Sequence, residues 1–162
     1  MVTEARPNGG HNPSPVPPFT VVVADDDRGT REALGEVLQA QGFRPVLAAD
    51  GGEAVEIVQV ELVHLVLFDM HMPRLTGLEA LTLLRHTLDR VLPAVLMTAD
   101  ATTELMRQAL SAQVYSVIPK PVKANVVLHT LARAIAQVYG PPPKPTPPAG
   151  GPATPPAPPD RG

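Results

Sequence analysis

The chain has 162 residues, which is the length of a single domain. Its 13 basic and 16 acidic side chains give a formal charge of −3, and it has three Phe, two Tyr and no Trp. This composition argues against a protein that binds nucleic acid through phosphate contacts and base stacking. The absence of cysteine excludes disulfides, thiolate metal sites and a cysteine nucleophile.

Neither a secretion signal nor a membrane span is visible in the sequence. The first ten residues lack the basic and then apolar pattern of a signal peptide. The apolar runs fall far short of the roughly 18 residues that a membrane helix needs. We therefore expect a soluble cytoplasmic protein that binds neither membranes nor nucleic acid.

The prolines divide the chain into three parts. Of 21 prolines, five lie in residues 1–18 and eleven in residues 141–162, so only five remain in the long stretch between. Segments so rich in Pro, Ala and Gly bury too little apolar surface to offset the entropy of ordering. We expect one folded unit at residues 19–140, with a charge of −4 from ten basic and fourteen acidic side chains, between disordered tails at 1–18 and 141–162.

Short apolar runs alternate with longer segments of helical spacing along the folded unit. The predicted strands are Phe19–Ala24, Arg44–Ala48, Leu65–Phe68, Ala94–Thr98 and Val114–Ile118. Val and Leu dominate these runs with little polar alternation, which is typical of parallel strands buried on both faces. Five strand–helix units in alternation predict an α/β fold, an open parallel sheet with helices on both faces.

The segments between the runs carry apolar stripes and boundary residues of helices. The stripes are Leu34, Val37 and Leu38; Leu81, Leu84 and Leu88; and Leu128, Leu131, Ile135 and Val138. Asp27 is a predicted helix N-cap, and Gly42 can end the first helix. The pairs Asp50–Glu53 and Thr76–Glu79 have the spacing of a capping box at a helix start.

Polar residues follow several of the predicted strands. Asp25 and Asp26 come after the first strand, Asp69 after the third, Thr98 closes the fourth, and Lys120 follows the fifth. Taken singly, each has a simpler interpretation, such as a solvated turn, a strand threonine or a surface lysine. Ligands of open parallel sheets, however, bind beyond the carboxyl ends of the strands, so we expect these side chains to share one edge.

Carboxylates that converge in this way repel one another unless a cation joins them or some are protonated. Oxygen ligands without cysteine favour a hard divalent ion, and few side-chain ligands favour Mg²⁺, which keeps positions for water and phosphate oxygens. A carboxylate beside Mg²⁺, a lysine and a hydroxyl suits phosphoryl transfer onto that carboxylate.

Four pieces of the sequence match a known family in order and spacing. They are Val21–Asp27, Phe68–Pro73 with Gly77 four residues later, Met97–Ala99, and Pro119–Pro121. Residues 19–140 thus resemble the receiver domain of two-component response regulators, and no second folded domain is predicted, so we expect a stand-alone receiver. The resemblance implies a flavodoxin-like sheet of five parallel strands in the order 2-1-3-4-5.

The resemblance also implies roles for the site residues. Asp69 is the expected phosphoacceptor. The expected Mg²⁺ ligands are Asp26 and Asp69 directly, Asp25 through water, and the backbone carbonyl of His71. Lys120 is expected to bind one phosphoryl oxygen and Thr98 to hydrogen-bond another.

One position departs from the family pattern. Many members carry Tyr or Phe three residues before the lysine, whereas this chain has Val117. Tyr115 lies two residues earlier and is predicted to share a strand face with Val117, because strand side chains alternate. Two interpretations stay open: Tyr115 replaces the missing aromatic, or it is an ordinary packed residue and the response depends on Thr98 and loop movement.

The function implied by the resemblance is a signalling one. Asp69 accepts a phosphoryl group from a partner histidine kinase or phosphotransfer protein, and a phosphorylation-dependent surface then binds a downstream target protein. The protein is expected to assist its own phosphotransfer and slow autodephosphorylation without being an enzyme. The alternatives are a phosphorelay intermediate, a phosphate sink, a hydrolase that passes through an aspartyl-phosphate, a receiver that takes no phosphate, and a scaffold whose Pro142 and Pro145 recruit polyproline-binding domains.

Overall fold

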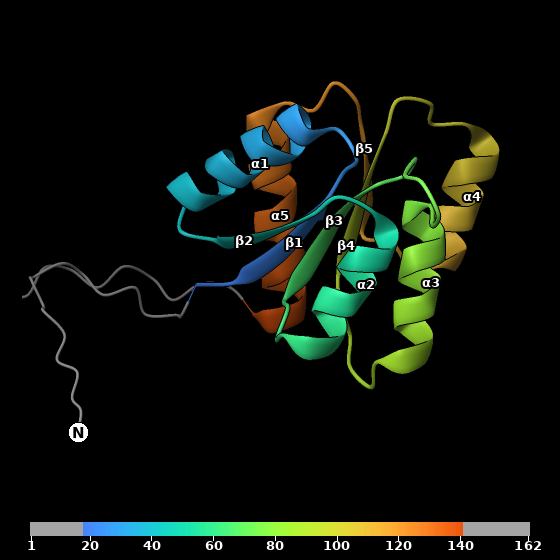
Figure 1. Cartoon of the computed structure of the whole chain (residues 1–162), viewed down its shortest axis with the longest axis horizontal. Helices are drawn as coiled ribbons and strands as arrows, with labels where there is room; N and C mark the ends of the chain where they lie inside the picture. Colours follow the sequence, from blue (N-terminus) through green and yellow to red (C-terminus); the bar gives the residue numbers. More distant parts are fainter. Residues whose placement is uncertain (1–17, 141–162) are drawn as a thin grey trace, which may run out of the picture.

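The computed structural model describes residues 18–140, so the predicted tails lie outside the described residues apart from Pro18. Strands and helices alternate along the whole of this range (Figure 1). The strands are β1 (Thr20–Ala24), β2 (Arg44–Ala48), β3 (Leu65–Asp69), β4 (Ala94–Thr98) and β5 (Ser116–Pro119). The helices are α1 (Arg28–Ala40), α2 (Gly51–Val60), α3 (Gly77–Thr87), α4 (Thr103–Ser111) and α5 (Ala124–Tyr139).

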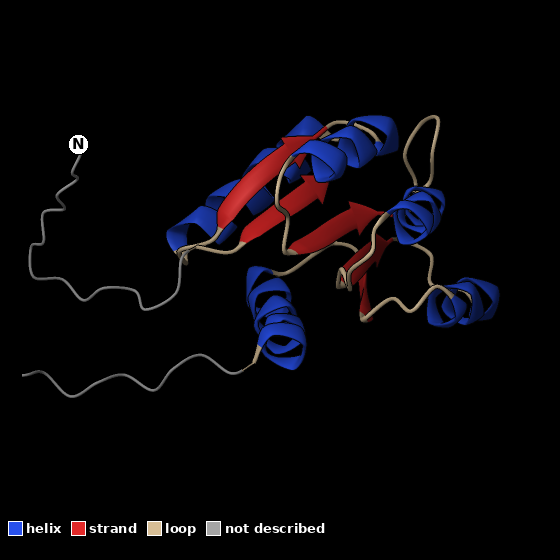
Figure 2. Cartoon of the chain, turned by 90° about the horizontal axis from the view of Figure 1, so that it is seen from below, coloured by secondary structure: helices blue, strands red, loops and turns tan. Residues whose placement is uncertain are grey.

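The five strands form one parallel sheet in the order β2-β1-β3-β4-β5. The helices lie on both sides of the strands (Figure 2). The predicted α/β architecture and its strand order are therefore confirmed. The helices between the strands return the chain to the start of the next parallel strand, and such crossovers are right-handed as a rule.

Two apolar layers enclose the sheet. Alternate residues of the central strands, such as Val22 and Phe68, face α2, α3 and α4, whereas Val21 and Leu67 face α1 and α5. Every residue of β1, β3 and β4 is buried, as expected for strands covered on both faces. The large apolar area removed from water is the main source of stability for such a sheet.

The register of the strands brings their carboxyl ends to a common edge. Ala24 pairs with Phe68, Asp69 pairs with Met97, and Thr98 pairs with Pro119. The residues that follow β1, β3, β4 and β5 consequently emerge on the same side of the sheet. This alignment is the structural basis of the site described below.

Helix boundaries follow the predicted capping residues closely. The side chains of Asp27 and Asp50 accept hydrogen bonds from main-chain amides in the first turns of α1 and α2. Thr76 and Glu79 form a reciprocal capping box at the start of α3. In α2 the expected box is incomplete, because the Glu53 carboxylate accepts from the amide of Ala49 rather than from Asp50.

Four predicted strand boundaries shift. β1 begins at Thr20 rather than Phe19, and β3 extends to Asp69. β5 runs from Ser116 to Pro119, so it begins two residues later and ends one residue later than predicted, and Val114 and Tyr115 belong to the connection that leads in from α4. Local apolar character cannot distinguish such a connection from the strand that follows it.

Candidate functional site

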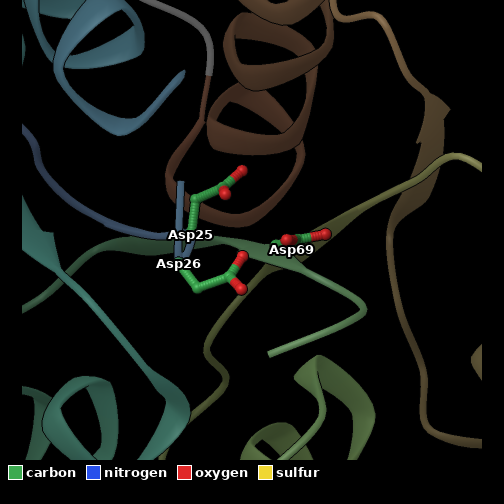
Figure 3. Close-up of side chains that lie close together, drawn as sticks. All are labelled: Asp25, Asp26 and Asp69. Atoms are coloured by element: carbon green, nitrogen blue, oxygen red, sulfur yellow. The ribbon is translucent and has the colours of Figure 1, made fainter. Parts of the chain in front are cut away.

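Three carboxylates meet at the carboxyl edge of the sheet. Asp25 and Asp26 follow β1, and Asp69 is the last residue of β3, so two separate strands bring them together (Figure 3). Each contributes one oxygen atom, and these oxygens lie within 4.8 Å of one another. Such an all-oxygen donor set suits a hard divalent cation, which would also relieve the repulsion between the acids.

Asp25 is completely buried and is held by contacts on both its side chain and its main chain. One carboxylate oxygen lies 3.0 Å from Nζ of Lys120, and the other accepts from the amide of Asp27 at 2.9 Å. Its main-chain carbonyl accepts from the guanidinium of Arg31 at 2.8 Å. The acid therefore has a fixed position, and Asp26 beside it is exposed at the mouth of the site.

Lys120 links the two buried acids. Its ammonium lies 3.3 Å from the Asp69 carboxylate as well as 3.0 Å from Asp25. Burial alone would lower the pKa of Lys120, but the hydrogen bond to Asp25 and the charges of Asp25 and Asp69 outweigh it and raise that pKa. The lysine is consequently a permanent cation beside both carboxylates at neutral pH.

Asp69 lies in an environment that disfavours its charged form. Burial, and next the neighbouring charge of Asp25, raise its pKa, although Lys120 and the amide of His71 act in the opposite direction. The amide of His71 lies 3.3 Å from Oδ1 of Asp69, whereas Lys120 contacts Oδ2. An added cation would favour the ionised carboxylate, which is the form that acts as a nucleophile.

The main chain of Gly77 lies against the main chain of Asp69 at the end of β3. A Cβ atom at position 77 would lie only 2.6 Å from the carbonyl oxygen of Asp69 and 3.2 Å from a methyl group of Leu96. The amide of Gly77 also donates to the carbonyl of Met70 at 3.0 Å. The loop after β3 can therefore fold back onto the strand end only because this residue has no side chain.

Thr98 closes β4 beside Asp69 and is fully buried. Its hydroxyl accepts from the amide of Asp100 at 3.1 Å, and its main-chain carbonyl accepts from the amide of Lys120 at 2.8 Å. The structure thus brings all five predicted side chains, those of Asp25, Asp26, Asp69, Thr98 and Lys120, to one edge. His71 reaches the site through its amide, and the metal-binding role of its carbonyl stays a prediction.

Tyr115 does not share a face with Val117. Val117 packs with the α2–α4 layer, whereas Tyr115 packs with the α1–α5 layer. The prediction that both lie on one face is wrong, because Tyr115 precedes β5 and strand alternation does not extend to it. Among the described residues, Val117 therefore stands in the place of the family's aromatic, and Tyr115 packs elsewhere.

Sequence reasoning missed Arg31, which holds the carbonyl of Asp25 from the first turn of α1. Its position five residues after Asp26 places it one turn into the helix that follows the acidic pair. An arginine there is an ordinary helix residue in the sequence, and only the path of the loop shows which carbonyl it contacts.

Among residues 18–140, no helix combines the length and the apolar character needed to cross a membrane.

A sheet of this order with an acid–lysine cluster at its carboxyl edge defines an α/β domain of the flavodoxin-like class. The model of the response regulator receiver domain matches residues 21–132. The chain belongs to this receiver domain family. The family typically uses a metal ion, and the cluster of Asp25, Asp26 and Asp69 is compatible with one.

Curated relatives are response regulators of mycobacteria. Response regulator MprA of Mycolicibacterium vanbaalenii is 38% identical over 104 residues, which cover 64% of this chain and 45% of the relative. The MprA protein of Mycobacterium sp. strain KMS is 35% identical over 132 residues, covering 82% of this chain and 56% of the relative. The chain spans about half the length of these relatives.

Solved receiver structures share the fold. A CheY-like response regulator receiver domain protein from Methanospirillum hungatei JF-1 has a TM-score of 0.71 at 24% identity, covering 75% of this chain and 97% of that one. The chemotaxis response regulator CheY4 of Vibrio cholerae has a TM-score of 0.68 at 25% identity, covering 72% and 98%.

Proposed function

We propose that Asp69 accepts a phosphoryl group from a phosphohistidine of a partner histidine kinase or phosphotransfer protein. A carboxylate oxygen of Asp69 forms the new P–O bond, the P–N bond breaks, and the electron pair leaves with the histidine nitrogen. The observation that carries this proposal is the joint contact of Lys120 with Asp25 and Asp69 beside a third carboxylate. Such positioning and charge neutralisation are the main requirements of phosphoryl transfer.

The proposed metal is Mg²⁺, held directly by the side chains of Asp26 and Asp69 and the carbonyl of His71, and by Asp25 through water. The all-oxygen donor set supports this choice. The bound ion supplies positive charge that offsets the developing charge on the phosphoryl oxygens. The exposed position of Asp26 leaves one side of the cluster open to the donor.

Lys120 and Thr98 act on the phosphorylated form in this proposal. Lys120 already carries its positive charge and has only to exchange a carboxylate oxygen of Asp69 for a phosphoryl oxygen. Thr98 offers a hydroxyl from the adjacent strand end. The protein assists its own phosphorylation and slow dephosphorylation, and we propose that it works as a phosphoacceptor in the cytoplasm rather than as a turnover enzyme.

The signal is proposed to leave through a surface that changes with phosphorylation. The new group adds about −1.5 to −2 charges and several acceptor oxygens, which bind Thr98 and Lys120 differently from a bare carboxylate. A difference in binding of this kind shifts the populations of two pre-existing conformations. A downstream target protein then binds the conformation that the phosphoryl group favours.

The proposal is tested by incubating the protein with acetyl phosphate and Mg²⁺ and measuring the bound phosphoryl group by intact mass. We expect the wild type to gain one acid-labile phosphoryl group and Asp69→Asn to gain none. Asp89→Asn is the matched control, because Asp89 is exposed and follows α3 away from the site. Phosphorylation of Asp69→Asn at the wild-type level, or a wild type that takes no phosphate with Mg²⁺ present, would overturn the proposal.

A further inference from the structure

Three aromatic rings from distant parts of the sequence meet at the amino-terminal edge of the sheet. Phe19 precedes β1, His64 precedes β3, and Tyr139 ends α5, with ring centroids 5.1 to 5.5 Å apart. The hydroxyl of Tyr139 donates to the main-chain carbonyl of His64 at 2.7 Å. This cluster lies at the opposite edge from the acidic site and has no part in the function proposed above.

The rings line a surface hollow of about 660 Å³, which we call the aromatic groove. Its main lining residues are Phe19, Leu62, His64, Val91, Val138 and Tyr139. Leu62 and Val91 are 68% and 67% exposed, so apolar side chains on its rim remain in contact with water. A second hollow of about 590 Å³ shares Val91 and Val138 with it and extends as far as Pro93 and Tyr115.

The chain leaves α5 at the rim of this groove. Tyr139 lines the groove, and Gly140 follows with a φ of +94°, a conformation that favours glycine and ends the helix. The next eight residues, 141–148, are Pro-Pro-Pro-Lys-Pro-Thr-Pro-Pro, which lie outside the described residues. Six prolines in eight residues thus begin two residues after Tyr139, which lines the groove.

Aromatic-lined grooves are the surfaces on which proline-rich segments dock, because a polyproline helix loses little conformational entropy on binding. A segment tethered at the groove rim is also present at a high effective concentration, in the millimolar range for short flexible links that let it reach the site. A separate ligand or a second copy of the chain must compete with that tethered segment. The first argument favours a proline-rich occupant, and the second favours one from the same chain.

We propose that the aromatic groove binds residues 141–148 of its own chain. The prolines cover the exposed side chains of Leu62 and Val91 and pack on the rings of Phe19 and Tyr139. The bound segment keeps this face of the receiver domain from contacting other proteins.

The test uses the full chain and a spin label. The sequence has no cysteine, so Ala149→Cys provides a single labelling position just beyond the proposed segment. Paramagnetic broadening is then measured by NMR at the amides of Val91 and Gln137, relative to the reduced, diamagnetic label. A second labelled protein carries serine in place of all six prolines of residues 141–148, which keeps the tether length unchanged.

Two further labelled proteins separate the groove from the rest of the surface. Leu62→Ser with Val91→Ser changes exposed groove residues, and Leu110→Ser changes a residue of α4 that is 78% exposed and lies outside the groove. We expect the broadening at the amides of positions 91 and 137 to fall by about twofold or more with the serine tail and with the groove substitutions, as expected when a tethered contact is lost. Leu110→Ser should leave it unchanged.

Equal broadening in all four proteins would overturn the proposal. A mixture of ¹⁵N-labelled chain without spin label and spin-labelled chain without ¹⁵N tests for a second copy as the occupant. Broadening in that mixture at the level of the single protein would also overturn the proposal, because the contact would then be between chains. The phosphorylation assay above is independent of these results, so failure of one proposal leaves the other standing.

Discussion

Val117 and Tyr115 lie two residues apart in the sequence and pack on opposite faces of the sheet. The receiver pattern that this chain resembles has an aromatic at the position of Val117. In this chain the residue at that position is the smaller valine, and the ring of Tyr115 packs with α1 and α5. Thr98 and Tyr115 therefore cannot move together on one face of the sheet, as an aromatic at position 117 could with Thr98.

Tyr115→Ala should therefore reduce stability without changing the response to phosphate. Tyr115 is half-buried, so we expect the free energy of unfolding to fall by about 1–3 kcal/mol. The affinity for beryllofluoride with Mg²⁺ should stay at the wild-type value, whereas Thr98→Ala should lower it. Urea unfolding and a beryllofluoride titration measure the two effects. A weaker beryllofluoride affinity in Tyr115→Ala would show that the ring takes part in the response.

Lys120→Ala should destabilise the protein by leaving two buried carboxylates without their cation. The lysine side chain is 23% exposed, and it contacts Asp25, which is completely buried. Removing one partner of a buried pair costs several kcal/mol, and the partial exposure reduces this to about 2–4 kcal/mol. We expect added Mg²⁺ to recover more stability in this variant than in the wild type, as measured by thermal unfolding. The exposed Lys123, changed to Ala, is the control; equal losses in both variants would contradict the prediction.

His64 should make the protein less stable as the pH falls. Burial, and next the charge of Arg90, lower the pKa of His64 below its ordinary value of about 6.5. The ring accepts a hydrogen bond at Nδ1 from the amide of Thr20, 3.0 Å away, and that bond requires Nδ1 to be unprotonated.

The unfolded chain therefore binds the proton of His64 at a higher pH than the folded chain does. The stability linked to this group is fully present above about pH 6.5 and decreases as the pH falls towards the lowered pKa. His64→Asn keeps an acceptor oxygen for the Thr20 amide and removes the titration, so its free energy of unfolding should decline less between about pH 7 and pH 5. His129→Asn, at an exposed position on α5, is the control. Identical pH profiles for His64→Asn and the wild type would count against the prediction.

Gly77→Ala should disturb the phosphoacceptor directly. The added Cβ would lie 2.6 Å from the carbonyl oxygen of Asp69, and main-chain atoms at a strand end have little room to move. We expect a loss of about 1–3 kcal/mol in the free energy of unfolding, together with slower phosphorylation by acetyl phosphate.

Gly29→Ala is a matched comparison in α1, where the new Cβ would meet only a side-chain oxygen of Asp27 at 3.6 Å. Alanine is the better helix former, so that variant should gain about 0.5 kcal/mol. Chemical denaturation and single-turnover phosphorylation compare the two proteins. Equal stability of the two variants would mean that the space around Gly77 is not limiting.

The gathering of the site residues was predictable from the sequence because each follows a strand of a parallel sheet. Once Asp25, Asp69 and Lys120 are assigned to strand ends, the topology alone brings them to one edge. The order of the strands depended on the resemblance to a family, since alternating strands and helices allow several orders. Helix starts were predicted well because a capping side chain acts on amides only two or three residues away.

Other features depend on contacts that the sequence does not encode locally. The hydrogen bond from Arg31 to Asp25 requires the path of the loop between β1 and α1. The ring cluster joins positions 19, 64 and 139, and its members meet only after the sheet has formed. The late start of β5 could not be predicted because the apolar residues that lead into a strand look like the strand itself in sequence.

The hydrogen bond from the Lys120 amide to the Thr98 carbonyl continues the pairing of β4 and β5 to the edge of the site. The main chain of both residues is thereby anchored to a strand that has neighbours on two sides. Any displacement on phosphorylation is therefore left to their polar side-chain ends, which can exchange partners, and to the exposed stretch 99–102. We expect a crystal structure with beryllofluoride bound to superimpose on the present sheet throughout, with atomic displacements concentrated in that stretch and in the adjoining end of α4.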